Sequence, residues 1–170
     1  MKANLKTDET RFASRIDLPT ESRERIIDLL NESLASLTDL YSQSKFAHWN
    51  VKGANFIAVH KLFDELAEIV EDAIDDFAER ITALGGIARG TLRQTANATM
   101  LDEFPENTFQ SSEVVGIVAD RFANLANTIR RDVEVANNVK DPGTADLLTQ
   151  TCREFDKAVY FLSAHEQPEI

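Results

Sequence analysis

The sequence has a single cysteine, no long apolar run and a deficit of basic residues. The lone Cys152 cannot form an intrachain disulfide, which indicates a reducing compartment. No apolar stretch approaches the roughly 20 residues that cross a bilayer. The first fifteen residues also lack the apolar core of a signal peptide. We therefore expect a cytoplasmic protein without a membrane-spanning segment.

Basic residues are outnumbered, with 18 lysines and arginines against 29 aspartates and glutamates and a formal net charge of −11. Phosphate contacts require basic surface, so this balance disfavours general nucleic-acid binding and suits the attraction of cations. The N-terminus has a slight positive excess, to which Lys2, Lys6 and Arg11 contribute. It is either an ordinary terminus or a short tail that contacts DNA phosphates.

The length of 170 residues, with 43% apolar and 28% charged residues, is that of one globular domain spanning residues 1–170. Apolar residues recur at helical spacing in four stretches. We expect these to form helices over residues 20–50, 55–84, 111–139 and 142–164. Residues 1–18 would form a mobile N-terminal tail.

The boundaries and connections of these helices can also be predicted. Thr20 is expected to cap the first helix, and Asp141 followed by Pro142 is typical of a helix start. Residues 87–110 form an unusually long connection, which we expect to cross the bundle and to carry a short helix over residues 100–104. Four helices with one long crossover between the second and third describe an all-α, ferritin-like four-helix bundle.

The second predicted helix carries a stripe of histidine and carboxylate residues. His60, Asp64, Asp75 and Glu79 follow one another at steps of 4, 11 and 4 residues. At about 100° per residue, these steps keep all four within roughly 100° of one helix face. Along the axis, however, His60 and Glu79 are roughly 28 Å apart at 1.5 Å per residue. No single ion can therefore contact both ends of the stripe.

The spacing of the stripe suggests a symmetric dimer. The midpoint between His60 and Glu79 is also the midpoint between Asp64 and Asp75, at residues 69–70. If two copies of this helix pack antiparallel about a two-fold axis at that midpoint, His60 faces the partner's Glu79, and Asp64 faces the partner's Asp75. We therefore hypothesise that an isologous dimer builds two identical clusters of ligands.

His48 lies near the end of the first predicted helix and would join this cluster if the two helices pack side by side. The set would then be His48, His60 and Asp64 from one chain, with Asp75 and Glu79 from its partner. Imidazole and carboxylate together suit iron, manganese or zinc better than calcium. The alternative is a solvated acidic helix face with two incidental histidines.

An iron centre inside one chain is disfavoured by the sequence. Such centres use Glu-x-x-His pairs, whereas the residues three positions before the histidines are Lys45, Ile57 and Leu162. Trp49 lies next to His48 and is either a packing residue or a redox-active neighbour of the site.

Residues 47–86, AHWNVKGANFIAVHKLFDELAEIVEDAIDDFAERITALGG, resemble the Dps miniferritins, the "DNA-binding proteins from starved cells". The segments GTADLLTQ and YFLSAH add weaker similarity. The resemblance implies a hollow dodecamer of four-helix subunits that oxidises Fe²⁺, preferentially with H₂O₂, and stores the ferric mineral inside. Such a ferroxidase protects the cell against oxidative stress.

The resemblance also assigns residues by position. His48, His60 and Asp64 match ferroxidase ligands from one subunit, and Asp75 and Glu79 match those from its two-fold partner. In the same way Trp49 matches a tryptophan beside this site.

Two further matches concern the pore and the tail. Asp141 and Asp146 fall near the acidic iron-entry pores of the family, although Asp141 also suits a simple helix cap. Lysine-rich tails bind DNA in some members of the family, and this tail has few basic residues. The alternative function is a non-enzymatic stress protein that coats DNA in the nucleoid.

Overall fold

The computed structural model describes residues 12–167, which form five α-helices and no strand. The only β-type pairing in these residues is an isolated bridge between Lys52 and Gln110. The helices are α1 (Thr20–Asn50), α2 (Phe56–Ala83), α3 (Leu92–Ala98), α4 (Ser111–Asn138) and α5 (Pro142–Ala164).

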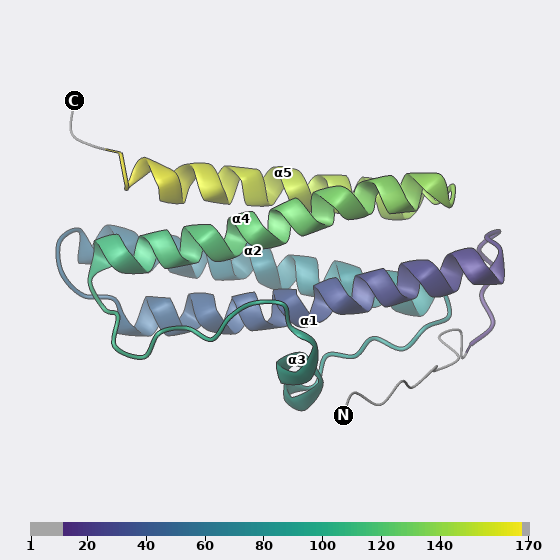
Figure 1. The fold of residues 1–170 in the computed structure, drawn as a ribbon, viewed down its shortest axis with the longest axis horizontal. Helices are drawn as coiled ribbons and strands as arrows, with labels where there is room; N and C mark the ends of the chain where they lie inside the picture. Colours follow the sequence, from purple (N-terminus) through teal and green to yellow (C-terminus); the bar gives the residue numbers. More distant parts are fainter. Residues whose placement is uncertain (1–11, 168–170) are drawn as a thin grey trace.

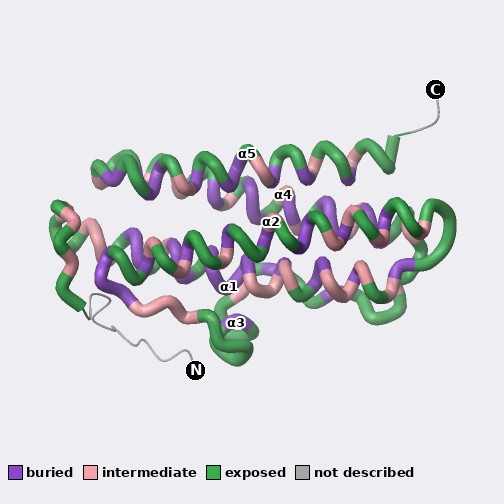
Figure 2. Tube along the Cα trace, turned by 180° about the vertical axis from the view of Figure 1, so that it is seen from behind, coloured by how far each residue is buried: buried purple, intermediate pink, exposed green. Residues whose placement is uncertain are grey.

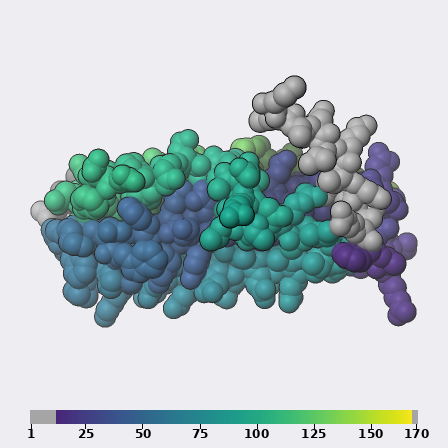
Figure 3. Space-filling model, turned by 90° about the horizontal axis from the view of Figure 1, so that it is seen from below, coloured from purple at the N-terminus to yellow at the C-terminus, as the bar shows by residue number. Residues whose placement is uncertain are grey.

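The four long helices form a bundle of two antiparallel pairs, α1 with α2 and α4 with α5 (Figure 1). The segment between α2 and α4 runs back along the outside of the bundle and carries α3, which packs against α1 and stands out from the surface in Figure 3. The predicted all-α bundle with a long crossover is thus confirmed. None of the helices over residues 12–167 has the length and apolar character of a membrane span.

The core is built from the inward faces of the four long helices (Figure 2). One phenylalanine pair joins α4 to α5, with the rings of Phe122 and Phe155 fully buried and their centroids 5.0 Å apart at 63°. On α2 the inward residues Phe63, Val70 and Phe77 are fully buried. Because burial of a large apolar side chain stabilises a fold by about 1.5–3 kcal/mol, these residues fix the helix faces that remain outside.

Two local predictions were wrong. The N-cap of α1 is Pro19, and Thr20 is the first helical residue and makes no capping hydrogen bond. The short helix lies at Leu92–Ala98, where Thr91 and Gln94 form a capping box, and not over residues 100–104. Leu101 and Phe104 are instead buried against the bundle, so this stretch anchors an irregular segment.

Asp141 joins the start of α5 to the end of α2. Its carboxylate accepts hydrogen bonds from the Thr144 backbone N–H at 3.0 Å and from Arg80 Nη2 at 2.6 Å. Burial alone would raise the pKa of Asp141, but the hydrogen bonds from Arg80 and Thr144 outweigh it and hold the pKa below the ordinary value. The predicted cap is confirmed, with an added ion pair.

Residues 12–18 lie against the turn that follows α2. The Phe12 N–H donates to the Gly85 carbonyl at 3.0 Å, and Ser14 Oγ donates to the Ala83 carbonyl at 2.7 Å. Gly85 has a φ of +91°, and a Cβ there would lie 2.3 Å from the Phe12 carbonyl oxygen, so only glycine fits this contact. Of the predicted mobile tail, residues 1–11 lie outside the described residues, together with Lys2, Lys6 and Arg11.

We predict that Asp141→Asn lowers the free energy of unfolding by roughly 1.5–3 kcal/mol, the range for a hydrogen bond to a charged group. Asparagine is still a good N-cap, so the loss reports the ion pair with Arg80. Because the folded-state pKa of Asp141 is lowered, its stabilisation is present above pH about 4 and disappears as the pH falls through the folded-state pKa. Denaturant unfolding at pH 7 and pH 3, at one protein concentration, measures both effects. Equal destabilisation at the two pH values would contradict the assignment.

Candidate metal centre

The first half of the site lies where α1 ends and α2 begins. His48 is in the last turn of α1 and His60 is in the second turn of α2, and their rings stack with centroids 3.8 Å apart. The connection between them is short because Gly53 and Asn55 take positive φ angles of 102° and 59°. This turn is tied to the segment before α4, where the Lys52 N–H donates to the Phe109 carbonyl at 2.8 Å.

Each of the two histidines is held by the backbone of the other. His48 Nδ1 lies 2.8 Å from the His60 carbonyl oxygen, and His60 Nδ1 lies 2.8 Å from the His48 carbonyl oxygen. A carbonyl can only accept, so each Nδ1 is the protonated donor and each Nε2 keeps its lone pair. Fixing the tautomer through the other ring nitrogen is the arrangement that metal-ligating histidines use. The two imidazoles are therefore set to bind an ion through Nε2.

Asp64 lies one turn beyond His60 on α2, and its side chain is 45% exposed. Its Oδ1 is 3.9 Å from His48 Nδ1 and accepts a hydrogen bond from Lys45 Nζ. The hydrogen bond from Lys45 lowers the pKa of Asp64, and the same bond raises the pKa of Lys45. The ammonium of Lys45 thus stands beside a carboxylate that the sequence predicts to be a ligand.

Lys45 is the residue that the sequence analysis missed as part of the site. It lies three residues before His48, a spacing that places both side chains on one helix face. That spacing was the available signal, but it does not say which carboxylate a flexible lysine would reach.

The second half of the site lies toward the other end of α2. Asp75 and Glu79 are exposed, and neither side chain makes a hydrogen bond or ion pair within residues 12–167. Over the same residues, no three His, Cys, Asp or Glu side chains are grouped so that one chain could hold a metal ion. One chain therefore places His48 beside His60, with Asp64 Oδ1 3.9 Å from His48 Nδ1, but does not arrange the three as a metal-binding group, and it leaves Asp75 and Glu79 apart from them.

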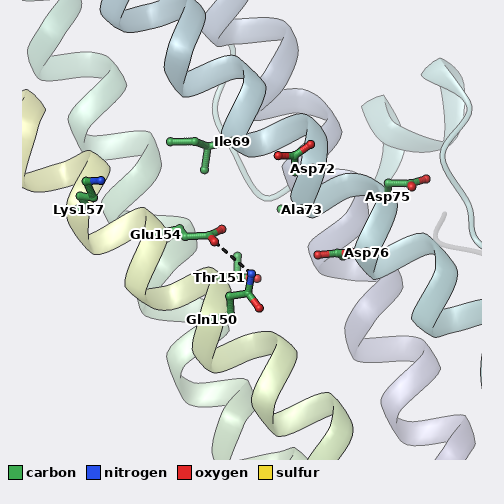
Figure 4. A pocket seen from close by; sticks show the side chains of 9 residues that line it. All are labelled: Ile69, Asp72, Ala73, Asp75, Asp76, Gln150, Thr151, Glu154 and Lys157. Carbon is green, nitrogen blue, oxygen red and sulfur yellow. Dashed lines mark hydrogen bonds between the residues drawn. The ribbon is translucent and has the colours of Figure 1, made fainter.

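An acidic groove of about 500 Å³ lies between α2 and α5, and Asp75 is one of its lining residues (Figure 4). Its lining includes Asp72 and Asp76 of α2 and Glu154 of α5, with Lys157 as the single cation. Gln150 Nε2 donates to Glu154 Oε1 at 3.2 Å across one turn of α5. In Figure 4 the carboxylate of Asp75 points away from α5, toward the outer face of α2. The groove and the ligand stripe therefore lie on adjoining faces of one helix.

The remaining predicted residues lie outside this cluster. Trp49 is 65% exposed, so it does not pack in the core of a single chain. Asp146 is exposed on the first turns of α5. Asp141 is 2% exposed and paired with Arg80, so its role in the chain is the helix cap, and the pore prediction rests on Asp146.

A family model described as a ferritin-like domain matches residues 27–167 of the chain. The chain is similar to the DNA protection during starvation protein of Agrobacterium fabrum, with 38% identity over 163 residues. That match covers 96% of this chain and 98% of the relative.

Solved structures share the fold. DpsA14 from Streptomyces coelicolor has a TM-score of 0.89 at 33% identity, with 95% of both chains covered. A Dps protein from Vibrio cholerae, described as a member of a broad superfamily of ferritin-like diiron-carboxylate proteins, has a TM-score of 0.86 at 26% identity. That comparison covers 91% of this chain and 97% of the Vibrio chain. The predicted ferritin-like fold is confirmed, and the chain belongs to the Dps family of ferritin-like proteins.

Proposed function

We propose that this protein is an iron-detoxifying and iron-storing miniferritin that acts in the cytoplasm. It oxidises Fe²⁺, preferably with H₂O₂, at a site shared by two chains and stores the ferric product in a hollow homo-oligomer, a dodecamer. One observation carries the proposal. His48 and His60 use Nδ1 in hydrogen bonds and leave Nε2 free, while Asp75 and Glu79 of α2 have no hydrogen bond or ion pair in the described residues. The description of the Vibrio relative as a diiron-carboxylate protein supports iron as the substrate.

The shared site requires a two-fold contact along α2. Ile74 is apolar but only partly buried in a single chain, and it directly precedes Asp75 of the ligand stripe. A second α2 packed antiparallel about residues 69–70 would bring the partner's Asp75 and Glu79 to the histidines. The apolar surface and the ligand spacing thus favour the same axis.

The donor set suits the oxidation. Carboxylates stabilise Fe³⁺ more than Fe²⁺ because the attraction between opposite charges grows with the charge of the ion. Two Fe²⁺ ions each give up one electron, and one H₂O₂ takes both electrons and two protons to form two water molecules. The chain would supply ligands of fixed orientation, and Trp49, which is exposed and next to His48 in the sequence, is the proposed redox neighbour. Zinc or manganese would fit the same nitrogen and oxygen donors.

The acidic groove is the proposed surface on which ferric ions collect. Asp72, Asp76 and Glu154 offer oxygen ligands next to Asp75, so an oxidised ion can leave the shared site without passing through free solution. Asp146 is the proposed pore residue. The groove thus offers carboxylate ligands that can bind the ferric product of the oxidation.

We predict that Asp75→Asn combined with Glu79→Gln abolishes saturable Fe²⁺ oxidation while the subunits still fold and assemble. Each substitution keeps the shape of the side chain and removes the anionic ligand. The measurement is an anaerobic Fe²⁺ titration followed by peroxide. Asp120→Asn combined with Glu134→Gln, two exposed positions on α4, is the control with equal charge loss. Oxidation that persists in the Asp75 and Glu79 variant would overturn the site assignment.

We predict that Lys45→Met tightens Fe²⁺ binding by about fivefold, because the ion no longer has to displace the hydrogen bond from Lys45 to Asp64, and exposed ion pairs of this kind are weak. Lys45→Arg keeps the positive charge and serves as the control. Anaerobic calorimetry with Fe²⁺ measures the affinity. An affinity in Lys45→Met equal to that of the parent would show that Lys45 does not compete with the ion.

DNA coating is the second candidate function, and the name of the Agrobacterium relative favours it. We predict no stable complex at about 150 mM salt, since the subunit charge of −11 repels phosphate. Gel-shift experiments at low and physiological salt, with and without residues 1–11, test this. A complex that persists in salt and is lost on deletion would assign DNA binding to the segment with Lys2, Lys6 and Arg11.

A further inference from the structure

A polar cavity of about 310 Å³ lies between α4 and residues 100–102, in the segment that follows α3. No residue of α2 lines it, so the cavity is separate from the proposed iron site. The α4 residues of its polar lining lie within about 120° of one helix face, at steps of 3, 3, 1 and 3 residues. The polar lining residues are Asp102, Arg121, Asn124, Asn127, Thr128 and Arg131. Two arginines thus meet at one cavity of a chain with a net charge of −11.

Arg121 is held at this cavity by a buried glutamine of α1. Its side chain is 13% exposed, and its Nε donates to Gln43 Oε1 at 3.3 Å. The amide nitrogen of Gln43 donates to the Asp102 carbonyl at 3.0 Å and to Asp39 Oδ1 at 3.2 Å, which leaves Oε1 to accept from the guanidinium. Among residues 12–167, only Nε of Arg121 has a hydrogen-bond partner. Both terminal nitrogens of a positioned guanidinium therefore remain for a ligand.

The second arginine has no acidic partner. In the described part of the chain, Arg131 makes no ion pair, and its one hydrogen bond runs from Nη2 to the Thr128 hydroxyl at 3.0 Å. Asn127 is oriented by the neighbouring Arg130, whose Nη1 donates to Asn127 Oδ1 at 2.6 Å. Because that oxygen is occupied, the amide N–H groups of Asn127 are the atoms left to donate. The cavity thus adds neutral N–H donors to its two positive charges.

One acid, Asp102, also lines the cavity. Its side chain is 93% exposed, and its Oδ2 lies 3.6 Å from Arg121 Nη1, which is longer than a hydrogen bond. Ion pairs that involve an exposed side chain contribute little, so this carboxylate is easily displaced from the guanidinium. Guanidinium groups bind the oxygens of phosphate through paired N–H bonds. The donors and the charge of the cavity therefore fit an oxoanion.

We propose that this cavity binds a small anion of the phosphate class, such as inorganic phosphate. The terminal nitrogens of Arg121 and Arg131 donate to its oxygens, and the amide of Asn127 donates a further hydrogen bond. At about 30 Å³ for each water, the cavity has room for the ion and several waters. A free phosphate fits better than a polyanion such as DNA, because a polyanion must also approach the acidic remainder of the chain. The proposal does not depend on the iron function.

Calorimetric titration of the metal-free, full-length protein with inorganic phosphate tests the site. Metal is removed first because a bound cation would itself attract phosphate. At constant ionic strength, we expect one saturable phosphate site per chain that an equal concentration of chloride leaves intact. Absence of a saturable site at millimolar phosphate would overturn the proposal. A short duplex DNA that displaces the phosphate at about 150 mM salt would also overturn it, since the ligand would then be a nucleic-acid backbone.

Arginine variants separate the cavity from the rest of the surface. Arg121→Gln combined with Arg131→Gln should weaken phosphate binding at least about tenfold, because both charged donors are lost. Arg93→Gln combined with Arg153→Gln removes the same charge from exposed positions on α3 and α5 and should leave the affinity unchanged. Arg131→Gln alone changes an exposed residue and should weaken binding about fivefold, so the test remains if the double variant fails to fold.

A variant of the competing acid should act in the opposite direction. Asp102→Asn should tighten phosphate binding severalfold, because it removes the carboxylate beside Arg121. Glu113→Gln, with the same charge loss at the start of α4, is the control and should not. The melting temperature without phosphate checks the folding of each variant. An unchanged affinity in a folded arginine variant would overturn the proposal, and so would equal effects of Asp102→Asn and Glu113→Gln.

Discussion

The length of α2 is the constraint on which the proposed function depends. His60 and Glu79 share one face of a straight helix but lie roughly 28 Å apart along its axis. A rigid helix cannot bend its two ends together, so the ligands of one chain cannot all reach one ion. In the described residues of a single chain, no three ligating side chains are grouped so that they could hold a metal ion. In our proposal, the site becomes complete only through a second copy of the same helix.

Both halves of the proposed site lie near ends of α2 that hydrogen bonds hold to neighbouring segments. The reciprocal hydrogen bonds of His48 and His60 fix the α1–α2 turn, and the bridge from Lys52 holds that turn to the segment before α4. At the opposite end of α2, Arg80 pairs with Asp141 directly after Glu79. Two half-sites on one rigid helix keep a fixed separation, which an antiparallel partner can match. In the proposed dimer, the rigid bundle therefore fixes the distance between the two sets of metal ligands.

Much of the fold follows from local rules that a sequence displays. Helical spacing predicted the four long helices, and Asp141 with Pro142 marked the start of α5. The distance along α2 likewise predicts that the ligands divide into two sets, and this stays a prediction. The failures concern local helix boundaries. Thr20 suits a cap by residue type, but Pro19 takes that position, and the short helix begins at Leu92, where Thr91 and Gln94 form the capping box.

The contacts of the candidate site residues could not be predicted from the sequence. Neither the shared hydrogen bonds of the histidines nor the contact of Lys45 with Asp64 can be derived from spacing, since both depend on how α1 packs on α2.

Mixing two inactive variants tests the central claim most directly. His60→Ala and Glu79→Gln, dissociated and reassembled together, should regain saturable Fe²⁺ oxidation, because random pairing leaves about a quarter of the shared sites with all five ligands. A mixture no more active than the average of the two variants alone would contradict a site shared between chains.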